Sequence, residues 1–214
     1  MKRILLAALV ICVGMAAQAQ KVNFGIKAGV NLSSLGDFDY RLTGGEDADL
    51  ANGVGPYGGV FTQIYLTKQF GLETGLYYTQ LGGREREKDV FEDYKVTARG
   101  SYLQLPLSAF YEFPVTKKIS LYPSLGVYGA YGLAGKIKTE GQYNAVDLKS
   151  ENDYFGDFAN RFDFGGTAGL QVSFGRLLIG GSFDHGITRV NKTKINREDN
   201  AYNSAVRVTV GFRF

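Results

Sequence analysis

Apolar residues recur at every second position over most of the chain, and this alternation is the feature that most constrains its fold. In residues 22–32, apolar side chains occupy all six even positions, while asparagine, glycine and lysine occupy the odd ones. Seven further segments repeat the pattern: 54–66, 70–80, 101–112, 119–133, 160–174, 177–188 and 204–214. A period of two places alternate side chains on opposite faces of a β-strand. The sequence therefore predicts eight strands and an all-β fold.

The two faces of the predicted strands differ strongly in polarity. One is almost entirely Val, Leu, Ile and Phe. The other carries Gly, Tyr, Ser and Thr with eight charged residues: Lys27, Glu73, Glu112, Arg161, Asp163, Asp184, Arg207 and Arg213. A soluble eight-stranded barrel, such as a lipocalin, fits the strand count, but eight charges cannot form its dry core. They can fill the polar lumen of a membrane barrel whose apolar face contacts lipid.

The connections between these segments alternate in length. They are short near 68–69, 115–118 and 175–176, and long and polar at 33–52, 82–100, 136–157 and 189–203. Short turns at one end and long loops at the other are typical of outer-membrane barrels, whose short turns face the periplasm. A closed barrel also leaves no backbone group unpaired in lipid. The predicted fold is an eight-stranded antiparallel transmembrane up-and-down β-barrel.

The first nineteen residues have the composition of an export signal. Lys2 and Arg3 precede an apolar run over 4–17, and Ala17-Gln18-Ala19 supplies a small-x-small cleavage site. The run of about 14 residues is too short to span a bilayer as a helix, and the bulky residue before Cys12 disfavours a lipoprotein signal. We expect residues 1–19 to be cleaved, leaving a barrel domain at 20–214 without cysteine and therefore without disulfides.

Composition argues against several classes of function. Lys and Arg number 24 against 21 Asp and Glu, so there is no basic excess of the kind that binds nucleic acid. One His and one Cys leave little material for a metal site or for His- or Cys-based catalysis. We therefore predict no cofactor, no metal site and no nucleic-acid partner.

Four local motifs have simple structural interpretations. The G-x-G-x-x-G run at 53–58 contains a proline and opens a strand, whereas a dinucleotide site needs a following helix. His185 shares the apolar face of Phe183, while Asp184 points to the other side, so we expect an interfacial histidine and not a catalytic one. We expect the acidic stretch at 37–49 and the mixed-charge run at 84–89 to be exposed loop.

Several strands resemble one family of barrels. Tyr102-Leu-Gln-Leu-Pro-Leu107 resembles the Tyr-Leu-Glu-x-Pro-Leu strand of the Bacteroidetes outer-membrane β-barrel (PorT-like, "porin family") proteins, and 122–126, 162–169 and 183–187 are similar to its later strands. Gln104 departs from the usual Glu. The alternating strand 206–214 ends in Phe214, similar to the terminal signal by which barrels are recognised for assembly. The resemblance implies an outer-membrane location, the barrel-assembly machinery as a partner during biogenesis, and no catalytic set.

Four charges on the polar face are expected to lie at similar depth. Asp184 lies about seven residues from the periplasmic end of its strand, and Arg207 lies seven residues before Phe214. Antiparallel neighbours at equal height meet across a ladder, so we expect an Asp184–Arg207 pair. Lys27 lies at nearly the same depth and Glu73 slightly below. We predict that these four residues form an ion-pair network that plugs the lumen.

Three functions are compatible with this sequence. The first is a small integral barrel in outer-membrane lipid with a structural or surface-interaction role and a lumen filled by side chains. The alternative is a narrow porin-like channel for small solutes, although the interior of eight strands is just wide enough for side chains to fill. The third, an outer-membrane lipid-modifying enzyme, has the least support, because His185 and Asp184 point to opposite sides of the wall.

Deleting Phe214 is expected to impair barrel assembly while leaving export across the inner membrane intact, because the resemblance assigns this side chain to recognition by the assembly machinery. The measurement is the amount of heat-modifiable barrel in the outer-membrane fraction on gels run without boiling. The Phe214→Tyr variant, which keeps an aromatic ring, serves as the control. Normal assembly after the deletion would contradict the assignment.

Overall fold

The computed structural model describes residues 21–35, 51–88, 92–143, 146–155, 159–189 and 202–214. The predicted signal peptide, the acidic stretch at 37–49 and Asp89 lie outside the described residues. Among the described residues, no helix is long and apolar enough to cross a membrane. The strands are β1 (Val22–Leu35), β2 (Ala51–Tyr65), β3 (Phe70–Lys88), β4 (Glu92–Tyr111), β5 (Phe113–Pro114), β6 (Ile119–Tyr143), β7 (Val146–Asp153), β8 (Phe162–Phe174), β9 (Leu177–Gly186) and β10 (Asn203–Arg213).

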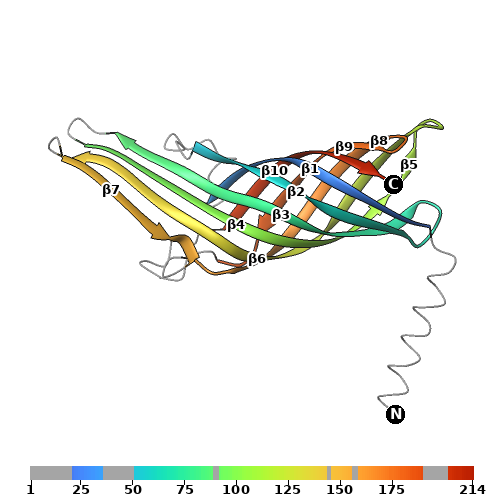
Figure 1. Cartoon of the computed structure of the whole chain (residues 1–214). Coiled ribbons are helices and arrows are strands. Elements are labelled where there is room, and N and C mark those ends of the chain that lie inside the picture. Colours follow the sequence, from blue (N-terminus) through green and yellow to red (C-terminus); the bar gives the residue numbers. More distant parts are fainter. Residues whose placement is uncertain (1–20, 36–50, 89–91, 144–145, 156–158, 190–201) are drawn as a thin grey trace, which may run out of the picture.

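Eight long strands form a closed antiparallel barrel, as the alternation predicts (Figure 1). Neighbours pair in the cyclic order β1, β2, β3, β4, β6, β8, β9, β10, and β1 pairs with β10 from Gly25 opposite Arg213 to Leu35 opposite Asn203. The two-residue strand β5 pairs with the start of β6, and β7 pairs with the end of β6. The closed wall leaves no free edge within the barrel.

Two of the expected long loops are largely strand, and here the prediction from sequence is wrong. β3 and β4 continue as a paired hairpin to Lys88 and Glu92, so most of 82–100, including residues 84–88 of the mixed-charge run, belongs to the sheet. Most of 136–157 is likewise strand, because β6 runs to Tyr143 and returns as β7. Outside the bilayer both faces of a ribbon meet water, so pairing persists without the apolar alternation that reveals strands inside it.

The apolar face points outward into lipid. Val208 at the middle of β10 is 55% exposed, and Leu105 of β4 is 56% exposed, although both are aliphatic. Two bands of aromatic side chains also face outward: Phe70, Phe174, Phe212 and Phe214 near the short turns, and Tyr78, Tyr131 and Phe162 near the other end. Rings at these two levels suit the two membrane interfaces. A lipocalin-like barrel would have the opposite sidedness.

Glycine is required at two points in the periplasmic half. Gly175, in the two-residue turn between β8 and β9, has a φ of 63°, a left-handed conformation that disfavours residues with a Cβ. Gly25 of β1 lies under the ring of Phe61, where a Cβ would come within 2.5 Å of ring carbons. The first glycine allows a tight turn, and the second makes room for an aromatic ring in a narrow interior.

Replacing Val208 by Arg is expected to lower the free energy of unfolding by about 2–4 kcal/mol, the usual cost of a cation at the lipid face near the midplane. The matched control is Val115→Arg, in the short turn before β6, where the cost near the interface is about 0–1 kcal/mol. Urea unfolding in lipid vesicles, followed by circular dichroism, measures both. Equal effects of the two substitutions would contradict the assigned lipid face.

Candidate functional site in the lumen

The centre of the lumen is occupied by an ion pair between β9 and β10. Arg207 Nη1 lies 2.6 Å from Asp184 Oδ2, and the two side chains are 4% and 3% exposed. The guanidinium also lies over the ring of Tyr57, 4.6 Å from its centroid. Its other two nitrogens donate as well: Nε to Asn31 Oδ1 and Nη2 to Gln104 Oε1, both at 2.8 Å. The cation is therefore compensated within the protein.

The carboxylate of Asp184 is equally well satisfied. It accepts hydrogen bonds from Gln104 Nε2 and Thr167 Oγ1, each at 2.7 Å, in addition to the ion pair. Gln104 therefore bridges the pair, since its amide donates to Asp184 and accepts from Arg207. A carboxylate at position 104, the residue usual in the resembled family, could accept from Arg207 but would face Asp184 without a donor. The departure from the family pattern thus fits the local hydrogen bonding.

The pair forms along a diagonal of the ladder and not between directly opposite residues. Arg207 lies opposite Ser182, and Asp184 lies opposite Ala205. Diagonal neighbours in a sheet are about 7–8 Å apart, within reach of a long side chain. The prediction that Asp184 and Arg207 lie at equal height is therefore wrong by two residues along the strand. The long side chain of Arg207 spans this offset.

Lys27 and Glu73 form a second ion pair from β1 to β3, with Nζ 2.5 Å from Oε1. Gln63 Nε2 donates to the other oxygen of Glu73 at 2.9 Å, and Lys27 Nζ lies 4.4 Å from the centroid of the Phe61 ring. The structure thus brings the four predicted lumen residues together as two pairs. Lys27, Glu73 and Arg207 line one cavity of about 50 Å³, which has room for only a few waters.

An aromatic stack lies beside the ion pairs and lines the same cavity. The rings of Tyr57 and Tyr77 lie parallel, with centroids 4.8 Å apart and an interplanar angle of 16°. Both tyrosines are buried on the lumen side of β2 and β3. Charged, amide and aromatic side chains together therefore fill the middle of the barrel.

A second layer closes the outer end of the lumen, and the sequence did not reveal it. Tyr154 and Phe155 follow β7 directly and are 5% and 2% exposed. The ring of Phe155 packs edge-on against Tyr102, with centroids 5.3 Å apart, and fits over Gly132. These residues fall in a stretch expected to be polar loop. The two adjacent aromatic residues in this stretch could have predicted burial, because large aromatic side chains are mostly buried in folded proteins.

Asp163 lies beneath this aromatic layer as its polar anchor. Its carboxylate accepts hydrogen bonds from Thr188 Oγ1 at 2.8 Å, Asn203 Nδ2 at 2.9 Å and Tyr128 Oη at 3.3 Å. The donors come from β10, β6 and the chain after β9. A buried carboxylate with three donors holds these elements together at the outer mouth.

A third layer closes the periplasmic end. Tyr65 and Phe110 pack edge-on with centroids 5.2 Å apart, and Tyr122 lies beside them. Glu112 accepts from Tyr65 Oη at 2.7 Å and from Ser120 Oγ at 2.8 Å. Arg213 donates to Tyr122 Oη at 3.1 Å. The lumen is therefore obstructed at three levels.

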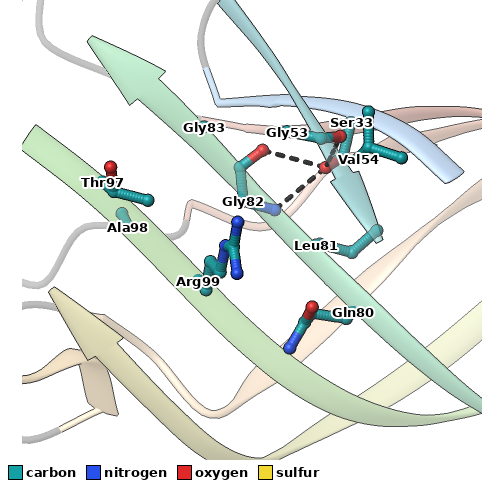
Figure 2. A pocket seen from close by; sticks show the side chains of 10 residues that line it. All are labelled: Ser33, Gly53, Val54, Gln80, Leu81, Gly82, Gly83, Thr97, Ala98 and Arg99. Carbon is teal, nitrogen blue, oxygen red and sulfur yellow. Dashed lines mark hydrogen bonds between the residues drawn. The ribbon is translucent and has the colours of Figure 1, made fainter. Parts of the chain in front are cut away.

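The described wall has register shifts at two points, one at Ser101–Tyr102 between β4 and β6 and one near the outer end between β2 and β3. The register shifts between Asn52 and Tyr57, within the glycine-rich run at 53–58. Side chains from β1 replace the missing ladder bonds. Asn31 Nδ2 donates to Pro56 O. Ser33 Oγ accepts from Gly82 N, and its single proton lies between Gly82 O and Gly53 O, at 2.9 and 3.2 Å (Figure 2). A Cβ on either Gly53 or Gly55 would collide with the backbone of β3. Glycine is thus needed here for close strand approach, not for a nucleotide.

His185 makes a contact that alternation did not predict. Its Nδ1 lies 2.9 Å from Ser204 Oγ on the neighbouring strand β10. Asp184, the adjacent carboxylate, points into the lumen and is bound to Arg207. Within the described residues there is also no cluster of three or more side chains able to hold a metal ion.

The central ion pair predicts a specific pattern of mutational effects. Arg207→Ala is expected to destabilise the barrel by about 3–5 kcal/mol, because it leaves a buried carboxylate uncompensated. Asp184→Ala in the Arg207→Ala background is expected to recover part of this loss. A double-mutant cycle by urea unfolding measures the coupling.

The exposed pair Lys136–Glu151 supplies the matched control, because its side chains are 67% and 47% exposed. We expect no measurable coupling there, since solvent screens exposed pairs. Additive losses at Asp184 and Arg207 would contradict the central pairing.

Comparisons with known proteins agree with the observed architecture. The family model for the outer membrane protein beta-barrel domain matches residues 17–192. No curated protein matches the chain.

Among solved structures, the chain is similar to Ail, the attachment invasion locus protein of Yersinia pestis, at 14% identity and a TM-score of 0.42, covering 91% of this chain and 99% of that one. It is similar to Neisserial surface protein A at 14% identity and a TM-score of 0.43, with the same coverage. A major outer membrane protein of Thermus thermophilus matches at 12% identity and a TM-score of 0.48, over 91% of this chain and 100% of that one. The family match covers most of the sequence, so this chain belongs to the outer membrane protein beta-barrel domain family and is an outer-membrane protein.

Proposed function

We propose that this protein is a non-conducting barrel whose function is performed by the polypeptide outside the bilayer. The observation that carries the proposal is the central lumen network, in which Arg207, Asp184 and Gln104 satisfy one another, and Arg207 lines a cavity of only about 50 Å³. A solute path would have to break this ion pair and also displace the aromatic layers above and below it. The narrow-channel alternative therefore requires a rearrangement at three levels.

The part of the protein best placed to act outside the bilayer is the extended sheet formed by the ends of β3, β4, β6 and β7. These strands run on beyond the rest of the barrel (Figure 1). Within the described residues, β7 pairs with β6 alone, so one of its edges carries unpaired backbone groups. An open strand edge can accept an extended segment of another chain. We infer a surface-interaction role for this sheet.

A catalytic function is not part of this proposal. The Ser204–His185 contact is the feature an outer-membrane hydrolase would use, but Asp184, the carboxylate next in sequence to His185, is committed to the lumen network. The strand at 102–107 further supports placing the chain among the PorT-like barrels of Bacteroidetes, a family from which the sequence carries over no catalytic residues.

The proposal predicts that the purified, refolded protein shows no sustained single-channel openings in a planar lipid bilayer. A porin of sixteen strands in the same bilayer provides the positive control, because such barrels enclose an aqueous channel. A variant that truncates all three layers, with Tyr57→Ala and Arg207→Ala at the centre, Phe155→Ala at the outer end and Phe110→Ala at the periplasmic end, tests whether the plug is the cause, and openings are expected only there. Sustained conductance of the unaltered protein would support the channel alternative instead.

A further inference from the structure

A basic hollow lies on the outer wall of the barrel, over β3, β4 and β6. It encloses about 440 Å³, and its cationic lining residues are Arg99, Lys136 and Lys138. Gln80 and Ser101 add an amide and a hydroxyl, and Glu140 is the one carboxylate in the described lining. The hollow therefore combines cations with hydrogen-bonding groups on a surface outside the lumen.

The hollow lies immediately beyond the lipid-facing band. Tyr78, an outward ring of the outer aromatic band, donates to or accepts from Ser101 Oγ at the rim, at 2.9 Å. Gln80 follows Tyr78 by two residues, a rise of about 7 Å along the strand. The headgroup zone extends about 5–7 Å beyond the hydrocarbon on each side. The inner rim of the hollow at Gln80 therefore lies at the level of the outer-leaflet headgroups, and Arg99, opposite Gly82, lies about 7 Å farther along the strand, within reach of its long side chain.

Among the described residues, one of two directly opposed cations in the hollow has no acidic partner. Arg99 of β4 lies directly opposite Lys136 of β6 in the antiparallel register. Like charges in directly opposed positions destabilise a sheet. Within the described part of the chain, Arg99 forms no ion pair. A bound anion between the two strands would offset this repulsion.

One carboxylate on β7 modulates the basic hollow. Glu151 forms ion pairs with both Lys136 and Lys138, the second at 3.7 Å. The hydrogen bond from Lys136 lowers the pKa of Glu151, so this carboxylate is ionised at neutral pH. Glu151 thus competes with an incoming anion for the two lysines, while Arg99 remains available.

We propose that the basic hollow binds the phosphate of an outer-leaflet lipid headgroup. Arg99 and Lys136 would hold the phosphate between β4 and β6, with the acyl chains lying along the apolar band below. Arginine suits this role because its planar fork donates two hydrogen bonds to one phosphate. This inference is independent of whether the lumen conducts.

The experiment measures lipid binding to the purified full-length barrel in neutral detergent by native mass spectrometry. The probes are phosphatidic acid and phosphatidylcholine with identical acyl chains. We expect phosphatidic acid to bind more tightly. The triple variant Arg99→Gln/Lys136→Gln/Lys138→Gln is expected to weaken its binding about tenfold or more, given about 1 kcal/mol for each cation beside an anionic lipid surface.

Two controls separate a built site from general charge. The variant Lys117→Gln/Lys118→Gln/Arg176→Gln removes the same charge from exposed residues of the periplasmic turns. We expect it to leave the affinity for phosphatidic acid within about twofold. These three residues lie at the opposite end of the barrel from the basic hollow, farther from it than the Debye length of about 10 Å. Glu151→Gln is expected to strengthen binding, because it frees two lysines. Migration on unboiled gels verifies that each variant is folded.

Equal losses in the two triple variants would overturn the proposal, as would unchanged binding after removal of the three cations. If the triple variant fails to fold, the single variant Arg99→Gln decides. We expect it to reduce the affinity for phosphatidic acid by less than the triple variant would. An unchanged affinity would contradict the site. Complete displacement of phosphatidic acid by millimolar inorganic phosphate would show a general anion site and would overturn the assignment to a lipid headgroup.

Discussion

Every backbone N–H and C=O group within hydrocarbon must find a partner inside the protein, because each unpaired group costs several kcal/mol there. This requirement is met only when the first and last strands of the sheet pair. β1 and β10 do so over eleven residue pairs, from Gly25–Arg213 to Leu35–Asn203. Closure by eight strands then fixes a narrow interior and gives each strand one lipid face and one lumen face. The rest of the structure follows from these two surfaces.

The narrow interior explains why the lumen is polar yet closed. The two faces alternate along each strand, and the polar residues of this sequence fall on the face opposite the lipid. Charges in such a space need partners, and the protein supplies them as two ion pairs, Arg207 with Asp184 and Lys27 with Glu73. Neutral amides complete the coordination, most clearly at Gln104. The lumen is therefore a polar core in which hydrogen bonding takes the place of apolar packing.

Alternation predicted the strands and their faces because the bilayer imposes it on every membrane-spanning segment. The prediction from alternation was wrong outside the bilayer, where the lipid no longer requires one apolar face. The paired extension of β3 and β4 and the return of β6 as β7 lie beyond the bilayer, where either face can be polar. Burial of Tyr154 and Phe155 was equally hidden, because it depends on how the chain folds back over the mouth. Counting along strands placed Asp184 beside Arg207, but the exact diagonal register depends on strand stagger, which a sequence does not state.

The central claim is that the apolar face of each strand contacts lipid and the polar face fills the lumen. Because the chain has no tryptophan, single Trp substitutions along β10 test this directly, with quenching of their fluorescence by lipids brominated in the acyl chain. We expect strong quenching at Val206, Val208 and Val210 and weak quenching at Thr209, a period of two in phase with the apolar face. Quenching in the opposite phase, or without alternation, would contradict the account.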